Sequence, residues 1–468
     1  MKNLSHIQAW GNRTFRLAAL LGCLSVTALR AQPNAVNDYV VATGTAAVTF
    51  SPLVNDSDDD DLALSIASVS QPSLGNVTWD DSSITYTPNL SFKSFAGADK
   101  FTYTITDGID TATAEIIVGN PFYLQKGNFA GTLANPDGGY VTLTSNANGS
   151  FSGKLRDGTT GAAYSFRGAF ATDGTWSGTV GGLALALQFD VTNITGSQFG
   201  EYSITGTYDS VAFTLWHALY NSTSNPAPQT GKYTVLLPAA SGANPLVPAG
   251  TGYMTLSVNE SGNVSITGNL ADGMTFSDGV YITGGSDAFS NNFPIYALLG
   301  YATRGSLTGT VTFEDVPGVS DCDGSVTWVK PAQSNNPSLY PAGFNTTVSA
   351  VGSRYSQPPF GTLALGLTGS DPNANILLTE PDFAASLYHE LYITQGLNTS
   401  TDTVHVFNPG ADGLTLSINA GSGTFTGTFI HPLTGKPVNI KGALLHKQTR
   451  AAGYFLGPTQ SGNASIWP

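Results

Sequence analysis

The alternation of apolar and polar residues along this chain predicts strands almost everywhere. Short runs such as "AAVTFSPL", "DKFTYTITDG" and "GYVTLTS" alternate with a period of two and are separated by turns rich in Gly, Asn, Asp and Pro. The longest window with a helical pattern, "PDFAASLYHELYI" at residues 381–393, is short and ends in strand-forming residues. The sequence therefore predicts an all-β protein built mainly from antiparallel strands.

Three similar segments repeat in the later part of the chain. Residues 138–155 ("GGYVTLTSNANGSFSGKL"), 251–270 ("TGYMTLSVNESGNVSITGNL") and 412–429 ("DGLTLSINAGSGTFTGTF") each have the pattern of a strand, an Asn/Gly turn and a second strand. Further hairpins are expected at residues 163–180 and 438–457. Repetition on this scale predicts β-meander units closed as barrels or sandwiches.

The length of 468 residues predicts several domains, because one core rarely grows this large. The expected divisions are a signal peptide at 1–31, a sandwich at 32–119, and β-meander units at 120–228, 229–358 and 359–468. The last unit could pack with the one before it, so the repeats could form two or three closed domains. The segment "NSTSNPAPQTG" at 221–231 is the clearest linker.

The first 31 residues have the pattern of an export signal. Basic residues precede the apolar run "LAALLGCLSVTAL", and "ALRA" offers a cleavage point after Ala31. A lipoprotein cleavage box ending at Cys23 is the alternative. The apolar run is short for a membrane span. We therefore expect an extracellular or cell-surface protein with no transmembrane segment in the mature chain.

Residues 34–119 resemble the cadherin-like tandem repeat of large bacterial surface proteins. The segments that carry the resemblance are, in chain order, "AVNDY", "LVNDSDDDDLALSI", "SVSQPSLGNVTW", "ITYTPNLSF", "GADKFTYTITDG" and "TATAEIIV". The resemblance implies an immunoglobulin/cadherin-like sandwich, which suits the seven short strands that the pattern predicts here. The later repeats resemble uncharacterised secreted bacterial β-repeat proteins, and that resemblance implies no activity.

The run "LVNDSDDDDLALSI" at residues 53–66 is the strongest candidate site. Clustered carboxylates without nearby Lys or Arg suit a hard cation with oxygen ligands, which favours calcium over zinc. In an extended chain Asp56, Asp58 and Asp60 would project on one side. Neither an EF-hand loop nor the Gly-rich calcium-binding nonapeptide is present. The alternative is a solvated acidic turn whose charges oppose edge-to-edge strand pairing.

The resemblance also implies where a calcium site would be assembled. In calcium-binding sandwiches of this kind, the ligands come from the N-terminal segment, the first long loop and a later Asp. By position the implied ligands are Asn37, Asp38, Asn55, Asp56, Asp58 and Asp107. The chain departs from the family's Asp-x-Asp-Gly-Asp pattern, because an unbroken Asp series replaces the Gly that allows an unusual backbone angle.

Composition and motifs argue against several function classes. The net charge is -14, and with 18 Lys and Arg in the whole chain no basic patch is expected, so a nucleic-acid partner is not predicted. Neither a Gly-x-Ser-x-Gly elbow nor a His-Glu-x-x-His motif occurs. The histidines beyond the export segment are scattered: His217, His389, His405, His431 and His446. We assign no catalytic residue, although a glycosidase carboxylate pair could assemble only in three dimensions.

Aromatic and thiol side chains have a structural and a functional interpretation. Four tryptophans lie in alternating strands and are expected in the core, whereas exposed they would be platforms for sugar rings: Trp79, Trp176, Trp216 and Trp328. Cys322, within "SDCDGS", is expected to be a small buried thiol beside an Asp-Gly turn rather than a metal ligand.

These observations predict a secreted or cell-surface, non-enzymatic modular protein with an adhesive or structural role and a calcium-binding cadherin-like domain. Its partners would be surface glycans or other cell-surface proteins. The alternative is a carbohydrate-binding or carbohydrate-acting extracellular protein, which exposed aromatic rows or facing carboxylates would support. An outer-membrane barrel is a third alternative, and polar turns interrupt the strands too often to favour it.

Overall fold

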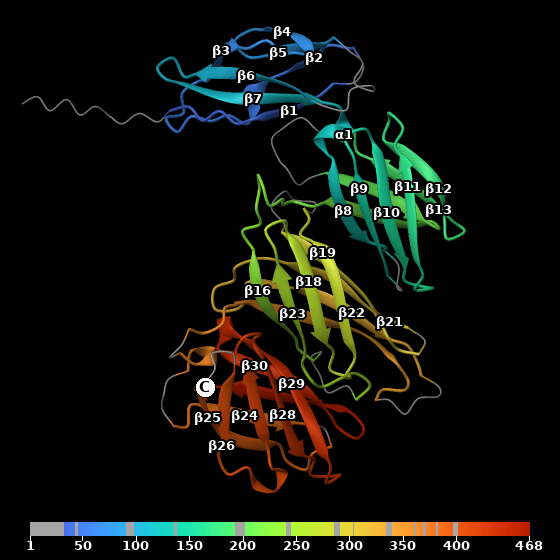
Figure 1. Cartoon of the computed structure of the whole chain (residues 1–468), viewed down its shortest axis with the longest axis vertical. Helices are drawn as coiled ribbons and strands as arrows, with labels where there is room; N and C mark the ends of the chain where they lie inside the picture. The colour runs from blue at the N-terminus through green and yellow to red at the C-terminus, as the bar shows by residue number, and fades with distance from the viewer. Residues whose placement is uncertain are drawn as a thin grey trace, which may run out of the picture.

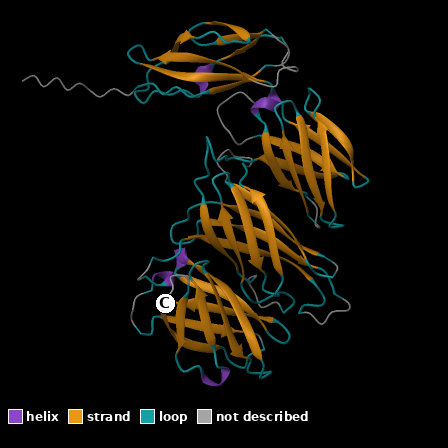
Figure 2. Ribbon diagram, in the orientation of Figure 1, coloured by secondary structure: helices purple, strands orange, loops and turns teal. Residues whose placement is uncertain are grey.

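A computed structural model describes most of the chain after residue 31. The described residues are 32–42, 45–89, 98–134, 138–191, 202–239, 245–284, 291–302, 304–333, 339–359, 362–367, 371–380, 382–395 and 401–468. The predicted signal peptide, with Cys23 and Ala31, lies outside them. Figure 1 shows four β units that follow one another along the chain, and Figure 2 shows that strands dominate each unit. The predicted all-β fold class is confirmed.

The first unit is a sandwich of two sheets. One sheet has the order β1 (Asp38–Val41), β7 (Thr111–Gly119), β6 (Ala98–Thr106) and β3 (Ser65–Val69), and the other has β2 (Val48–Phe50), β5 (Ile84–Pro88) and β4 (Gly75–Trp79). Strand β1 runs parallel to β7, whereas the other pairs are antiparallel. Tyr86 and Tyr103 are fully buried between the sheets. All seven strands expected from the alternating pattern are present.

The second unit is one eight-stranded sheet in which the predicted hairpin at 138–155 forms β9 and β10. The strand order is β11-β10-β9-β8-β15-β14-β13-β12. Its strands are β8 (Gly127–Thr132), β9 (Gly139–Ser145), β10 (Ser150–Asp157), β11 (Ala163–Ala169), β12 (Thr175–Val180), β13 (Leu183–Phe189), β14 (Ser203–Tyr208) and β15 (Val211–His217). The short helix α1 (Pro121–Leu124) precedes them, and its N-terminus is capped by the side chain of Asn120.

The hairpin predicted at residues 163–180 is wrong. Strands β11 and β12 follow one another in the chain, but they lie at opposite ends of the sheet order and are not paired. The indole of Trp176 lies directly over Gly168 of β11, packs edge-on against Phe151 and stacks on Phe166. This large ring fills the interior where the two strands approach each other, and each strand pairs with its other neighbour instead.

The third unit repeats the topology of the second, with the order β19-β18-β17-β16-β23-β22-β21-β20. Its strands are β16 (Gly231–Leu237), β17 (Gly252–Val258), β18 (Asn263–Asn269), β19 (Thr275–Tyr281), β20 (Asn292–Leu299), β21 (Gly305–Thr312), β22 (Cys322–Lys330) and β23 (Phe344–Tyr355). The Asp278 carboxylate on β19 accepts a hydrogen bond from the Tyr296 N–H on β20 at 3.0 Å. A side chain thus bridges the two edge strands that the backbone leaves unpaired.

The fourth unit is a closed eight-stranded barrel in which β24 pairs with both β25 and β31. Its strands are β24 (Ala374–Thr379), β25 (Leu387–Gln395), β26 (Asp402–Val406), β27 (Thr415–Asn419), β28 (Thr424–Ile430), β29 (Pro437–Leu445), β30 (Arg450–Leu456) and β31 (Ser461–Trp467). The hairpins predicted at 412–429 and 438–457 are β27–β28 and β29–β30. The helix-like window at 381–393 contributes to strand β25 instead.

The third and fourth units share a packed interface. Apolar side chains of the barrel, including Leu445 and Tyr454, join the buried core of the third unit. Polar contacts reinforce this packing: the Thr251 hydroxyl donates to Asn463 Oδ1 at 2.7 Å, and the Tyr340 hydroxyl lies 3.0 Å from that of Ser461. None of the helices in the described segments is long and apolar enough to cross a membrane.

Candidate functional site

The aspartate run begins beside the N-terminal segment of the first unit. The 3-10 turn η1 (Pro52–Val54) ends at Asn55, and the chain then runs alongside residue 34, where Asn34 and Ser57 exchange backbone hydrogen bonds of 2.8 and 3.1 Å. This pairing brings Asp56 under the N-terminal segment. Its Oδ1 accepts a hydrogen bond from the Val36 N–H at 2.7 Å. These hydrogen bonds therefore hold the N-terminal segment in place just before β1.

Tyr103 of β6 also belongs to this site, although sequence analysis did not identify it. Its hydroxyl lies 2.9 Å from both carboxylate oxygens of Asp56 and 2.9 Å from the Val36 carbonyl oxygen. Burial and the charges of Asp38 and Asp56 raise the pKa of Tyr103 well above its usual range, so the hydroxyl keeps its proton. In the "DKFTYTITDG" strand Tyr103 shares a face with Phe101 and Ile105, and nothing in this pattern indicates that Tyr103 meets an acid.

Asp38, the first residue of β1, is the second acid of the site. Its side chain is 8% exposed. Burial, with a smaller contribution from the charge of Asp56, raises the pKa of Asp38 to about 7, although Tyr103 and Asn55 favour the ionised form. Burial also raises the pKa of Asp56. Two acids therefore share a poorly solvated site with no Lys or Arg among their hydrogen-bond and ion-pair partners in the described chain.

Two oxygen atoms at this site are buried without a hydrogen-bond partner in the described structure: Asp38 Oδ2 and Asn55 Oδ1. The Asn55 amide nitrogen donates to the Asn37 carbonyl oxygen at 3.3 Å, with the Val36 carbonyl oxygen at 3.5 Å. Because both neighbours are acceptors, the nitrogen must face them, and the amide oxygen points the other way. A buried acceptor without a donor costs about 1–3 kcal/mol. A cation bound beside either oxygen would remove this cost.

The other three predicted ligands have different partners. The Asn37 side chain accepts from the Glu115 N–H on β7 at 2.8 Å. Asp58 Oδ1 accepts from the backbone N–H groups of Asp60 and Leu62, while its Oδ2 is buried and unpartnered. Asp107 closes its own hairpin loop by accepting from the N–H groups of residues 109 and 110. It lies four residues beyond Tyr103 along the strand direction, about 13 Å at 3.3 Å per residue.

The remainder of the aspartate run is solvated. Asp59, Asp60 and Asp61 are exposed, and Asp61 takes the left-handed backbone conformation with φ 55° that a Gly would adopt more easily. The run thus has two parts: Asp56 faces inward, whereas its end is an acidic turn. Among the described residues, no three acidic, His or Cys side chains gather closely enough to hold a metal ion by themselves. The predicted ligands that the described structure places beside one another are Asp38, Asn55 and Asp56.

Two histidines of the fourth unit are paired with acids. His389 Nε2 lies 2.8 Å from Asp412 Oδ2, and His431 Nε2 lies 2.6 Å from Glu380 Oε2, with both side chains of the second pair fully buried. The Leu433 N–H donates to His431 Nδ1 at 3.2 Å, so Nε2 carries the ring proton and donates it to Glu380. Both ring nitrogens are therefore occupied, which suits a structural tie more than acid–base catalysis.

The expected burial holds for Cys322 and Trp328, whereas the expected core position is wrong for Trp79. Trp328 and Cys322 are buried in the third unit, and burial raises the pKa of the Cys322 thiol. Trp176 and Trp216 are partly buried, whereas Trp79 on β4 is 41% exposed. The described tryptophans do not form an exposed row on one unit.

Comparison with known proteins assigns the first unit. Residues 30–119 match the family model described as a bacterial Ig domain. The immunoglobulin-like part of the expected resemblance is therefore confirmed, and the cadherin-like part stays a prediction. Among curated proteins, no sequence is similar enough to be reported as a relative.

Two solved structures illustrate how distant the structural matches are. The endo-fucoidan hydrolase MfFcnA4 from glycoside hydrolase family 107 has 15% identity and a TM-score of 0.15, covering 51% of this chain and 28% of that chain. The protocadherin GammaB4 extracellular domain has 8% identity and a TM-score of 0.13, covering 93% of this chain and 84% of that chain. Similarities at these TM-scores carry no argument about this chain.

Proposed function

We propose that this protein acts outside the cell or on its surface as a non-enzymatic modular protein with an adhesive or structural role, and that its immunoglobulin-like unit binds calcium. The bacterial Ig match at residues 30–119 supports a modular extracellular protein. The export-like pattern of residues 1–31 supports secretion. The observation that carries the calcium proposal is the acid pair of buried Asp38 and partly buried Asp56, with unpartnered oxygens on Asp38 and Asn55 in the described structure.

The chemistry of this pair favours a hard divalent cation. Two neighbouring carboxylates with little hydration either retain a proton or bind a positive ion. Calcium takes oxygen ligands from carboxylates, amides, carbonyls and water in a flexible geometry, whereas zinc prefers nitrogen and sulfur. Two carboxylates and one amide leave several positions for water, which suits the weak affinities of extracellular calcium modules, on the order of 10⁻⁴ to 10⁻³ M.

Calcium at this site would stiffen one end of the sandwich. Asp38 begins β1, whereas Asn55 and Asp56 belong to the loop after η1. An ion shared by these residues would tie the entry strand to the loop between the sheets. It would also displace the proton of Asp38, so binding should release protons near pH 7.

The test is calcium titration of the full-length chain in two buffers with different ionisation enthalpies. We expect binding with proton release at pH 7, and a stabilisation of about 2.7 kcal/mol when calcium exceeds its dissociation constant a hundredfold. Asp38→Asn should abolish both effects. Asp80→Asn is the matched control, because Asp80 is an exposed turn acid of the same unit. A calcium response that survives in Asp38→Asn, or no response in the wild type, would contradict the proposal.

A carbohydrate-binding role is the second candidate. It is favoured by a polar cleft that lies between the second and third units. Because the acid pair belongs to the first unit, one protein could have both roles.

A further inference from the structure

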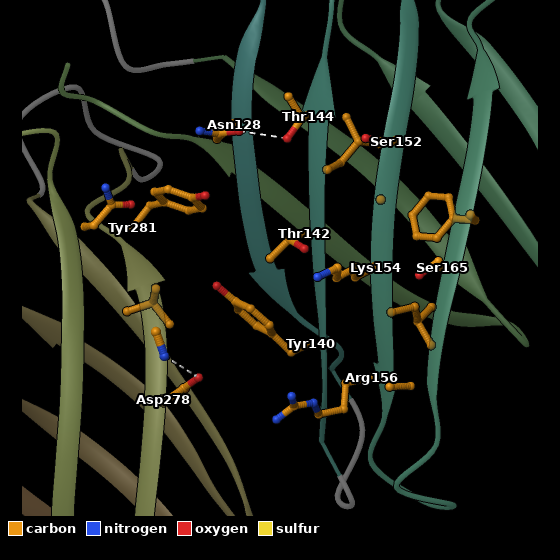
Figure 3. A pocket seen from close by; sticks show the side chains of 18 of the residues that line it. Asn128, Tyr140, Thr142, Thr144, Ser152, Lys154, Arg156, Ser165, Asp278 and Tyr281 are labelled. Atoms are coloured by element: carbon orange, nitrogen blue, oxygen red, sulfur yellow. Dashed lines mark hydrogen bonds between the residues drawn. The ribbon is translucent and has the colours of Figure 1, made fainter. Parts of the chain in front are cut away.

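A polar cleft lies between the second and third units. Its volume is about 1040 Å³. One wall is the outer face of β9, β10 and β11, and the opposite wall is formed by β18 and β19. Figure 3 shows Tyr140 and Lys154 on one wall and Tyr281 and Asp278 on the other. The walls are held in place by a backbone bridge between Ala218 and Thr283 and by the stacked rings of Tyr140 and Tyr296, 6.4 Å apart.

Three cations line the second unit's wall of this cleft. Lys154 and Arg156 alternate along β10, so both side chains project from the same face, and Arg167 of β11 is the register partner of Ser152. Along the strand direction, Arg167 lies level with Ser152, and Lys154 and Arg156 follow at steps of two residues. Each step is about 7 Å, so the three cations span about 14 Å. All three residues are exposed, and none takes part in an ion pair within the described structure.

This positive row stands out in a chain with a net charge of -14. The composition predicted no basic patch, and strand pairing assembles a small one. Asp278 is the one carboxylate among the described residues of the cleft, and it accepts from the N–H groups of Gly279 and Tyr296 at 2.8 and 3.0 Å. Its charge is thus partly met by the backbone and by the nearby charge of Arg156, and Lys154 and Arg167 are left for a ligand.

The remaining lining suits a hydroxyl-rich molecule. Short polar side chains come from both walls: Thr142, Thr144, Ser152, Ser165, Asn263, Ser265 and Ser277. Tyr140 is 9% exposed, and its hydroxyl is buried without a hydrogen-bond partner in the described chain. Tyr281 is partly buried on the opposite wall. Such a lining offers donors and acceptors for sugar hydroxyls, with the partly exposed ring of Tyr281 at one side.

We infer that this cleft binds an acidic polysaccharide, whose repeated carboxylate or sulfate groups meet Lys154, Arg156 and Arg167 in turn. The inference deepens the proposed surface role and rests on it. A row of charges spaced about 7 Å apart matches a chain with repeated charges better than one small anion. A nucleic acid is the weaker choice, because a patch of three cations is small for neutralising a dense phosphate backbone.

The test measures binding of the full-length chain to four probes at about 0.15 M salt, where exposed charge interactions are partly screened. The probes are polygalacturonate, dextran sulfate, uncharged dextran and a short DNA duplex. We expect polygalacturonate or dextran sulfate to bind and uncharged dextran not to bind. Binding of polygalacturonate identifies carboxylate as the recognised group, and binding of dextran sulfate identifies sulfate. The double variant Lys154→Gln/Arg167→Gln should weaken binding at least tenfold, because both substitutions lie on an exposed face.

The matched control is Lys436→Gln/Lys441→Gln, which removes the same charge from exposed positions of the fourth unit and should leave binding unchanged. Equal weakening in both variants, DNA binding as tight as polysaccharide binding, or no binding to either acidic polysaccharide would overturn the inference. The calcium titration reports separately on the first unit. If the protein shortened the polysaccharide during the binding measurement, the non-enzymatic part of the proposed function would be refuted. The assignment of the cleft as the polysaccharide-binding site would still hold.

Discussion

Replacing Asp38 with Asn should stabilise the first unit at alkaline pH when divalent cations are absent. Burial and the nearby charge of Asp56 raise the pKa of the Asp38 carboxyl from 3.8 to about 7. The folded unit therefore holds a proton that the unfolded chain has already released between about pH 4 and about pH 7. Because the folded state binds more protons in this window, its stability falls as the pH rises and levels off above the folded pKa.

The size of the effect follows from the shift. A rise of about three pKa units corresponds to about 4 kcal/mol as an upper bound. Solvent screening and relaxation of the surface loop reduce this, so we expect about 2 kcal/mol. The amide of Asn has nearly the same shape as the carboxyl group and cannot ionise. Asp38→Asn should therefore be more stable than the wild type at pH 8, and the difference should shrink as the pH falls through the window from about 7 to about 4.

Hydrogen–deuterium exchange of the intact chain in chelator measures this unit separately from the other three. Peptides from β1 and β7 report on local opening of the sheet that carries Asp38. A gain of about 2 kcal/mol corresponds to exchange about thirtyfold slower in Asp38→Asn than in the wild type at pH 8. The difference between the two proteins should shrink as the pH falls and become small near pH 4, and Asp80→Asn should follow the wild type throughout.

Faster exchange in Asp38→Asn at pH 8 would refute this reasoning. It would mean that the ionised carboxylate stabilises the native fold, and hence that partners other than those described compensate its burial. Protection that increases from pH 5 to pH 8 in the wild type would lead to the same conclusion.

Two further predictions concern the folding of the repeat units. Asp272→Leu should destabilise the third unit by about 3–5 kcal/mol in denaturant unfolding, because it leaves the buried Lys330 ammonium without its ion-pair partner at 3.1 Å. The double variant Asp272→Leu/Lys330→Met should recover most of this loss, and equal losses in the single and the double variant would contradict this account. Gly131→Ala should cost about 1–3 kcal/mol, because its Cβ would lie 2.0 Å from the Thr214 carbonyl oxygen on β15, whereas Gly279→Ala, with open space around it, should be neutral or slightly stabilising.

Elements that depend on neighbouring residues were predictable from the sequence. The hairpins at 138–155, 251–270 and 412–429 form because apolar alternation and Asn/Gly turns fix both the pairing partner and the buried face within about twenty residues. The seven strands of the first unit follow for the same reason. The aspartate run was recognisable as a candidate site from composition alone, because so many carboxylates rarely occur together without a ligand or solvent to satisfy them.

Only the tertiary structure decided which of these residues meet. Asp38, Asn55 and Asp56 converge because the segment before β1 pairs with the loop after η1, whereas Asp107 is carried away along a strand that rises about 3.3 Å per residue. The predicted hairpin at 163–180 failed because pairing of its strands depends on the closure of a whole sheet and on the indole that fills it. The positive row in the cleft depends on strand register, and its opposite wall lies about a hundred residues later in the chain. Local patterns determine elements, whereas long-range packing determines sites, because a site requires side chains whose distances no local pattern contains.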